Sequence, residues 1–167
     1  AEKVARLGLE LAQAPKKVGP LPALSNLFIE GYSTSFEGWP ELSALKTLHL
    51  MFSSGYGKKR TIPHPFSLAG LKAPALENLK LDGCALQDLK GLGQQATIEF
   101  ASRVCLRSLH GLQGNTAITR LDLTGFRDVE GLENAEAARD MPNLTELILP
   151  TGGEGDQARL EMLRAVK

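Results

Sequence analysis

A short hydrophobic pattern, in which two apolar residues flank one residue of any kind, recurs six times along the chain. The six copies are Leu27-Phe28-Ile29, Leu48-His49-Leu50, Leu79-Lys80-Leu81, Ile98-Glu99-Phe100, Leu121-Asp122-Leu123 and Leu147-Ile148-Leu149. Successive side chains of a β-strand point to opposite faces, so the outer residues of each copy share one face and the middle residue takes the other. One copy cannot bury its apolar face alone, whereas stacked copies share a core. The pattern predicts a repeat architecture with about six parallel strands.

Two further regularities define the repeat. Five copies carry a Leu or Ile three residues before the triplet, namely Leu24, Leu45, Leu76, Ile118 and Leu144, whereas the fourth copy has Gln95 there. A second pattern, apolar-any-Gly-apolar, alternates with the triplets, and its glycines are Gly38, Gly70, Gly91, Gly111 and Gly131. A glycine at one phase of a repeat indicates positive φ or a lack of room for Cβ. We interpret it as the turn by which each repeat returns on the far side of the core.

These residues resemble leucine-rich repeat proteins over about residues 21 to 150. The stretch from Leu76 to Leu92 is most similar to the family pattern L-x-x-L-x-L-x-x-N/C-x-L. The resemblance implies an α/β leucine-rich repeat solenoid with parallel strands on its concave face. The steps between triplets range from 19 to 31 residues, and only Cys84, with Ser53 as a looser match, fits the family's ladder position. The resemblance is therefore to an irregular member of this class.

The two ends of the chain are predicted to be capping helices. Apolar residues recur at helical spacing in residues 1–18 until Pro15 interrupts them, and Asp156 can cap a second helix within residues 155–167. Solenoids require such caps over their terminal repeats, although the first helix could instead bind a partner. The predicted division is a cap at 1–18, repeats at 19–154 and a cap at 155–167. A short helix at 133–141, with Ala135 and Ala138 inward, is expected on the convex side.

Composition and charge exclude several classes of ligand. The chain has 167 residues, and its 19 Lys and Arg balance its 19 Asp and Glu, so its formal net charge is zero. A neutral chain has no overall attraction to nucleic acid or to an anionic membrane. No apolar run approaches the roughly 20 residues that span a bilayer, so no membrane partner is expected.

The cysteines point to neither a metal nor a disulfide framework. Cys84 and Cys105 do not have the spacing of a structural metal site, and we expect no metal or cofactor. Secreted leucine-rich repeat domains usually carry cysteine-rich caps, so their absence favours a reducing compartment. With no signal-peptide pattern at the start, the prediction is a cytoplasmic protein or a delivered effector. The pattern does not indicate an oligomeric state.

The middle residues of the triplets are predicted to form a row of side chains across the concave face. This row is Phe28, His49, Lys80, Glu99, Asp122 and Ile148. Flanking rows are Asn26, Thr47, Asn78, Thr97, Arg120 and Glu146 on one side and Glu30, Met51, Asp82, Ala101, Thr124 and Pro150 on the other. A phosphate backbone demands clustered cations, which this mixed surface lacks, so protein or peptide is favoured over nucleic acid. We predict a non-enzymatic protein-interaction module, with Asn78 and Arg120 added to the central row as partner-binding residues.

Catalysis by this face is disfavoured. Glu99 and Asp122 are expected on adjacent strands, where two close carboxylates can divide acid and base roles. Lys80 and Arg120 lie beside them, so ordinary ion pairing is the preferred interpretation. The histidines are dispersed, and no Ser-His-Asp or Cys-His arrangement can be assembled.

An insertion at residues 52–66 supplies the alternative function. Its distinctive residues are Tyr56, Lys58, Lys59, Arg60 and His64. Loops on rigid scaffolds often carry function, and this one could bind an anion or a nucleic acid, with affinity that falls steeply as salt rises. A further alternative is the substrate-recognition part of a larger effector or enzyme, as in bacterial effector ligases whose catalytic domain is separate.

Overall fold

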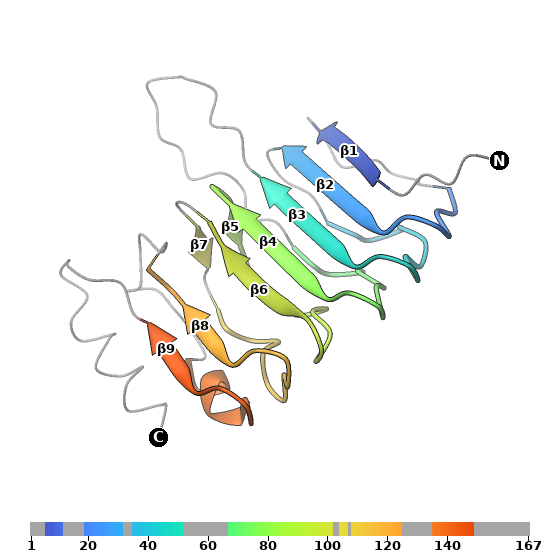
Figure 1. Cartoon of the computed structure of the whole chain (residues 1–167). Helices are drawn as coiled ribbons and strands as arrows, with labels where there is room; N and C mark the ends of the chain where they lie inside the picture. The colour runs from blue at the N-terminus through green and yellow to red at the C-terminus, as the bar shows by residue number, and fades with distance from the viewer. Residues whose placement is uncertain are drawn as a thin grey trace, which may run out of the picture.

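Parallel strands dominate the computed structural model, which describes residues 6–11, 19–31, 35–51, 67–101, 104–106, 108–124 and 135–148. The strands of the main sheet are β1 (Arg6–Leu11), β2 (Asn26–Gly31), β3 (Thr47–Met51), β4 (Asn78–Asp82) and β6 (Thr97–Phe100), in the order β1-β2-β3-β4-β6. Two smaller sheets pair β5 (Ala85–Leu86) with β7 (Cys105–Leu106) and β8 (Arg120–Asp122) with β9 (Glu146–Ile148). Figure 1 shows β8 and β9 next after β6 in the same row of strands, with β5 and β7 behind the main sheet.

The six triplets correspond to β2, β3, β4, β6, β8 and β9, each of which begins one residue before its triplet. Every strand pair is parallel, and equivalent residues lie opposite one another, as in the run Leu27, Leu48, Leu79 and Ile98. The predicted parallel strands and their register are therefore confirmed within β2, β3, β4 and β6 and within β8 and β9, whereas β6 and β8 are not paired with each other.

The outer residues of the triplets form the core. Leu27, Ile29, Leu48, Leu50, Leu79, Leu81, Leu121 and Leu123 are at most 1% exposed, and Leu24, Leu45, Leu76 and Ile118 are also buried. Ile98, Phe100 and Leu147 are partly buried against this cluster. Burial of one such side chain contributes about 1.5 to 3 kcal/mol, so the repeated leucines supply the main stabilising term. The inside and outside assignment is confirmed for the triplets of β2, β3, β4, β6 and β8. In β9, Leu147 and Ile148 are both partly buried, and Leu149 lies outside the described residues.

The predicted N-terminal capping helix is wrong where the structure describes it. Residues Arg6–Leu11 form β1, a parallel strand whose Leu7 and Leu9 lie opposite Leu27 and Ile29 in register. Leu7-Gly8-Leu9 is a further copy of the triplet, and its glycine costs a helix roughly 1 kcal/mol relative to alanine. The edge of β2 offers hydrogen bonds to such an alternating segment. The predicted C-terminal cap at 155–167 lies outside the described residues.

The glycine turns stack on the far side of the core. Turns 36–39, 68–71, 89–92 and 109–112 are each closed by a hydrogen bond from the fourth N–H to the first carbonyl, at 2.9 to 3.1 Å. Gly38, Gly70, Gly91 and Gly111 have φ between 79° and 108°, as the third position of a type II turn requires. A Cβ on Gly111 would lie 2.3 Å from the carbonyl of Leu89 in the preceding turn. Positive φ is confirmed at all four glycines, and the lack of room for Cβ is confirmed at Gly70, Gly91 and Gly111. Gly131 lies outside the described residues.

The fourth repeat departs from the pattern because it is one residue shorter. Its turn is closed from Ala96 N–H to the Gly93 carbonyl, and Ala96 is fully buried while Gln95 is exposed. Ala96 therefore occupies the position that a Leu or Ile holds before the triplet in the other repeats. It precedes Ile98, the first residue of its triplet, by two residues instead of three.

A 3-10 helix, η1 (Ala135–Asp140), precedes β9. Ala138 is buried, as predicted for this segment, and Ala137 is buried beside it. The carbonyl of Asp140 accepts a hydrogen bond from Gly114 N–H at 2.8 Å, which attaches η1 to the turn before β8. Among the residues described, no helix is both long enough and apolar enough to cross a lipid bilayer.

Candidate functional site

The outward side chains of β2, β3, β4 and β6 make up a surface that we call the outer face. Its central row is Phe28, His49, Lys80 and Glu99, each directly opposite the next. Its flanking rows are Asn26, Thr47, Asn78 and Thr97 at the start of the strands and Glu30, Met51 and Asp82 toward their ends. All of these side chains are half-buried or exposed, in contrast to the buried leucines between them.

Phe28 and His49 form an aromatic pair at one end of the central row. Their ring centroids are 4.9 Å apart, and the planes meet at 80°, which is the edge-to-face geometry that aromatic rings prefer. Burial lowers the pKa of His49, and the positive charge of Lys80 lowers it further, while Asp82 and Glu99 act in the opposite direction. His49 Nε2 is buried without a hydrogen-bond partner. The imidazole is therefore neutral at neutral pH and serves as part of an apolar surface.

Lys80 and Glu99 form an ion pair in the middle of the face. Lys80 Nζ lies 2.8 Å from Glu99 Oε1, across the pairing of β4 with β6. The hydrogen bond to Glu99 and its charge raise the pKa of Lys80, which keeps the ammonium charged. Both side chains are well exposed, so the pair adds little to stability and much to the charge pattern.

Arg120 bridges two carboxylates on β8 and β9. Its Nη2 lies 3.3 Å from Asp122 Oδ2, and its Nε lies 3.2 Å from Glu146 Oε2. Asp122 also accepts hydrogen bonds from the Thr124 hydroxyl at 2.6 Å and from the Thr124 backbone N–H at 3.0 Å. These two bonds, with a smaller effect of Arg120, hold the pKa of Asp122 below its usual value.

Glu99 and Asp122 are each bound to a basic side chain, which disfavours the hypothesis that they act together as an acid and a base. Glu99 is bound to Lys80 and Asp122 to Arg120, as the ion-pairing interpretation predicts. β6 and β8 belong to different sheets, so Glu99 and Asp122 are not paired across neighbouring strands as expected. Asp122 is ionised at neutral pH and cannot donate a proton as a general acid there.

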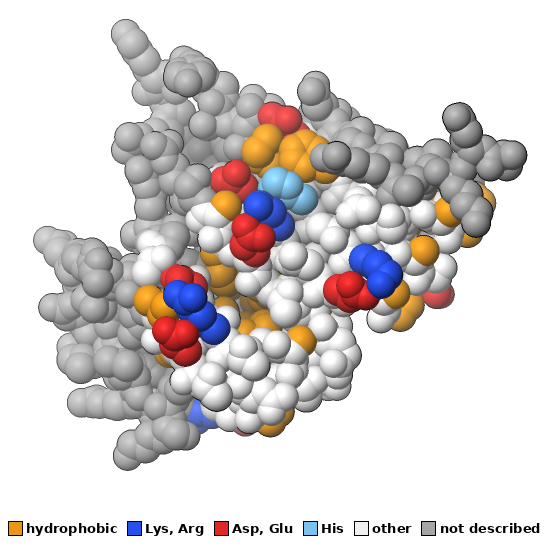
Figure 2. Space-filling model, viewed as in Figure 1, with side chains coloured by type: hydrophobic (Ala, Val, Ile, Leu, Met, Phe, Trp, Pro, Cys, Tyr) orange, Lys and Arg blue, Asp and Glu red, His pale blue; other side chains and the backbone are white. Residues whose placement is uncertain are grey.

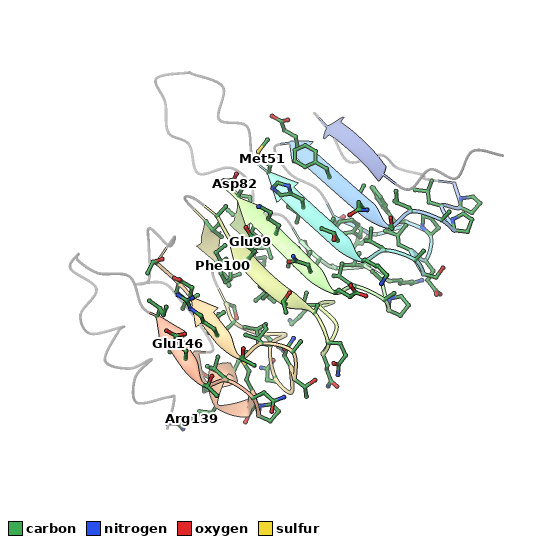
Figure 3. The ribbon with its side chains drawn as sticks, in the orientation of Figure 1. Met51, Asp82, Glu99, Phe100, Arg139 and Glu146 are labelled. Atoms are coloured by element: carbon green, nitrogen blue, oxygen red, sulfur yellow. The ribbon has the colours of Figure 1, made fainter. Side chains whose placement is uncertain are left out.

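The outer face has an apolar end and a charged middle. Figure 2 shows hydrophobic side chains gathered around the histidine, with carboxylates at their edge and a cation next to the histidine. Met51, which follows His49 by two residues, lies between Glu30 on β2 and Asp82 on β4 in register. Figure 3 shows Met51 and Asp82 at the same end of their strands. The sequence placed these three residues in a flanking row without assigning them to the site.

Ile148 extends the row only within the smaller sheet, where it lies opposite Asp122. Asn78, in the row at the start of the strands, has its Oδ1 buried without a hydrogen-bond partner. The structure therefore brings Phe28, His49, Lys80 and Glu99 together on one sheet, and Asp122, Ile148 and Arg120 on another.

The basic loop cannot be placed in this arrangement. Residues 52–66, which contain Tyr56, Lys58, Lys59, Arg60 and His64, lie outside the described residues. Within the parts of the chain that are described, no three His, Cys, Asp or Glu side chains are grouped as they would be to hold a metal ion. The anion-binding hypothesis for the loop stays a prediction.

Asn115 is an important polar residue that the pattern did not reveal. It is 1% exposed, and its Oδ1 accepts hydrogen bonds from the backbone N–H groups of Ala117 and Ile118 at 3.0 and 2.9 Å. Its Nδ2 donates to the carbonyls of Gly93 and Ala96. The sequence signal that could have identified this role is the Asn three residues before Ile118, because Asn side chains often accept hydrogen bonds from backbone N–H groups two or three residues later.

Comparison with family models, with curated proteins and with solved structures finds no match to this chain.

Proposed function

We propose that the chain is a leucine-rich repeat solenoid and a non-enzymatic interaction module, which binds another protein or a peptide through the outer face. The observation that carries the proposal is the central row, in which four chemically different side chains stand in strict register over one continuous leucine core. The leucines fix the backbone, so the outward residues are free to differ from strand to strand. A regular scaffold with a varied surface is suited to recognition.

Two stacked backbone ladders support the solenoid part of the proposal. On the far side the glycine turns lie against one another, as the Phe36 N–H to Ala69 carbonyl bond of 3.0 Å illustrates. At the start of the strands one carbonyl accepts two N–H groups of the next repeat. Ser25 accepts from Lys46 and Thr47, and Lys46 accepts from Glu77 and Asn78, at 2.9 to 3.0 Å. The repeats of β2, β3 and β4 thus contact one another in the same way at the start of the strands, and such repeated contacts between neighbours are typical of repeat proteins.

The chemistry of the outer face supports a protein ligand. Interfaces combine an apolar centre, rich in aromatic residues and Met, with a polar rim. Phe28, His49 and Met51 supply the first element, and the Lys80 and Glu99 pair supplies charged groups beside it. Strands about 4.8 Å apart give four strands a width of roughly 15 Å, which accommodates a peptide segment.

The test is quantitative capture of partners with three versions of the chain. The first is the parent. The second carries Lys80→Glu and Glu99→Lys. These changes exchange the members of an ion pair, so the surface pattern is reversed while the pair is retained. The control exchanges two exposed residues outside the outer face, by Glu41→Lys with Lys72→Glu.

All three proteins should fold, because surface changes usually alter stability by about 0.5 kcal/mol or less. Partners of the outer face should be captured by the parent and by the control, and at least about tenfold less by the outer-face variant. Equal capture by all three folded proteins contradicts the proposal.

A further inference from the structure

The row of strands is interrupted between β6 and β8. At the other junctions from β2 to β9, the carbonyl just before one strand accepts N–H groups at the start of the next strand. The carbonyls that accept in this way are those of Ser25, Lys46, Glu77 and Thr119. The equivalent carbonyl before β6 is that of Ala96, and it accepts the side-chain Nδ2 of Asn115 at 2.9 Å instead. The amide of Asn115 therefore takes the bond that would hold the start of β8 against β6.

Both strands direct unpaired backbone groups into this interruption. On β6, the Thr97 N–H donates at 2.8 Å to the carbonyl that precedes β4, so the N–H and C=O of the next residue, Ile98, point the other way, toward β8. On β8, the Leu123 N–H donates to β9, so Arg120 and Asp122 direct their backbone groups toward β6. Within the described residues, no backbone hydrogen bond joins these groups to a partner.

The floor of the interruption is apolar. Ile98 is only partly buried, whereas the equivalent residues Leu27, Leu48, Leu79 and Leu121 are at most 1% exposed. Figure 1 shows β6 and β8 farther apart than the paired strands on either side of them, and Figure 2 shows hydrophobic side chains recessed between two groups of paired charges. These groups are Lys80 with Glu99 on one side and Arg120 with its two carboxylates on the other. We call the space between β6 and β8, with Ile98 at its floor, the slot.

We propose that the slot binds one extended peptide strand, which completes the sheet between β6 and β8. An extended backbone carries N–H and C=O groups toward both sides, so it can pair with Ile98 on one side and with Arg120 and Asp122 on the other. Alternate side chains of a strand share one face, so apolar residues at every second position cover Ile98. The charges at the rims are already paired, and recognition therefore depends on main-chain atoms. The inference goes beyond the proposed function, in which side chains of the outer face make the contacts.

The first test is amide hydrogen exchange of the isotope-labelled whole chain, followed by NMR. In the free chain, the N–H groups of Ile98 and Arg120 should exchange at least tenfold faster than those of Glu99 and Leu121, which face β4 and β9. Protection of Ile98 and Arg120 without a ligand would mean that another part of the chain already fills the slot, and it would overturn the inference.

The second test is selection of a display library of random ten-residue peptides on the whole chain, with Arg120→Pro as the subtraction target. Proline removes an N–H that faces the slot and leaves the pairing with β9 intact, as edge positions of a sheet tolerate. Lys72→Pro is the matched control. Lys72 is exposed and lies outside the slot, and its N–H donates no backbone hydrogen bond among the described residues.

We expect the enriched peptides to carry Val, Ile or Leu at alternate positions. In fluorescence anisotropy, the best of them should bind Arg120→Pro at least tenfold more weakly than the parent, and it should bind Lys72→Pro as it binds the parent. The same peptide with N-methyl groups on alternate central residues should also bind the parent at least tenfold more weakly, because it has lost main-chain donors. That comparison needs no variant of the chain. The bound peptide should slow the exchange of Ile98 and Arg120.

Several outcomes of the selection would contradict the inference. They are no enrichment over Arg120→Pro, equal affinity for the N-methylated peptide, and a bound peptide that leaves the exchange of Ile98 and Arg120 unchanged. A dimer of the free chain in sedimentation, lost in Arg120→Pro, would assign the slot to a second copy. If the Lys80 and Glu99 exchange abolishes capture of partners while no peptide protects the slot, the proposed function stands and only this inference fails.

Discussion

The side-chain amide of Asn115 donates a hydrogen bond of 2.9 Å to the carbonyl of Ala96, and this bond joins the fifth repeat to the shortened fourth repeat. No strand pairing links β6 to β8, so the junction depends on bonds of this kind between the turns. The Thr116 N–H to Gln94 carbonyl bond of 2.9 Å and the Gln95 to Thr116 side-chain bond of 2.8 Å also join these two repeats.

Replacement of Asn115 should weaken the fold at this junction. Asn115→Ala leaves the buried Ile118 N–H, the part-buried Ala117 N–H and the Ala96 carbonyl without their partner, and we expect a loss of about 2 to 4 kcal/mol in the free energy of unfolding. Asn143→Ala is the control, because Asn143 is exposed and donates one bond, to the Thr116 carbonyl, so about 1 kcal/mol or less is expected. Urea unfolding measures both values. Equal losses for the two variants would mean that Asn115 has no special role.

The burial of the core leucines predicts a large loss of stability when one of them is truncated to alanine. Leu79→Ala and Leu121→Ala should each lower the free energy of unfolding by about 2 to 5 kcal/mol, because both side chains are at most 1% exposed. Lys90→Ala, at an exposed position of a glycine turn, should change it by about 0.5 kcal/mol or less. Thermal unfolding of the three variants provides the comparison. Neutral leucine variants would show that the faces have been assigned incorrectly.

Gly111 and Gly93 should respond differently to replacement by alanine. Gly111→Ala places a Cβ 2.3 Å from the Leu89 carbonyl at a φ of 108°, and we expect a loss of at least about 2 kcal/mol. A Cβ on Gly93 would meet no other part of the chain within 4 Å, and its φ is not positive, so Gly93→Ala should be neutral or stabilise by up to about 1 kcal/mol. Chemical denaturation distinguishes the two. A tolerated Gly111→Ala would contradict the stacking of turns 89–92 and 109–112.

The lowered pKa of His49 predicts that the stability of the folded chain depends on pH. Its pKa is lower in the folded chain than the ordinary value of 6.5, so the unfolded chain binds the proton more readily. The stabilising contribution is complete above about pH 6.5 and is lost as the pH falls through the folded pKa. His49→Gln should reduce this loss, as unfolding measured between about pH 5 and about pH 7.5 would reveal.

The same pKa can be followed directly by NMR titration. Lys80→Gln should raise the pKa of His49, because it removes a repelling charge and leaves Glu99 near the ring. The resonance is assigned by its absence in His49→Gln, which separates it from the resonances of the other two histidines. A pKa at or above 6.5 in the parent would show that the imidazole is not desolvated as described.

Much of this fold follows from period-two alternation. The triplets predicted β2, β3, β4 and β6 with their register, because a one-residue slip would expose the leucines. The recurring glycines predicted the turns, since few residues other than Gly adopt positive φ at no cost. The same alternation placed Phe28, His49, Lys80 and Glu99 on one face.

The errors have identifiable physical causes. Residues Arg6–Leu11 satisfy both a helical stripe and a strand alternation, and hydrogen bonding to β2 decides between them only in the folded chain. In the fourth repeat the buried position before the triplet is held by Ala96 instead of Gln95, and only the geometry of the turn at 93–96 shows this. The bonds of Asn115, and those of Thr124 to Asp122, depend on side-chain directions that a pattern of apolar residues does not specify.

The central claim is that the outer face is the binding surface. Backbone amide NMR of the isotope-labelled chain, titrated with a purified partner from the capture experiment, tests it most directly. We predict chemical-shift changes concentrated at the strand residues of the outer face, from Phe28 on β2 to Glu99 on β6, with the glycine turns at 68–71 and 89–92 unaffected. Changes concentrated at those turns or in residues 52–66, with the strands unaltered, would contradict the claim.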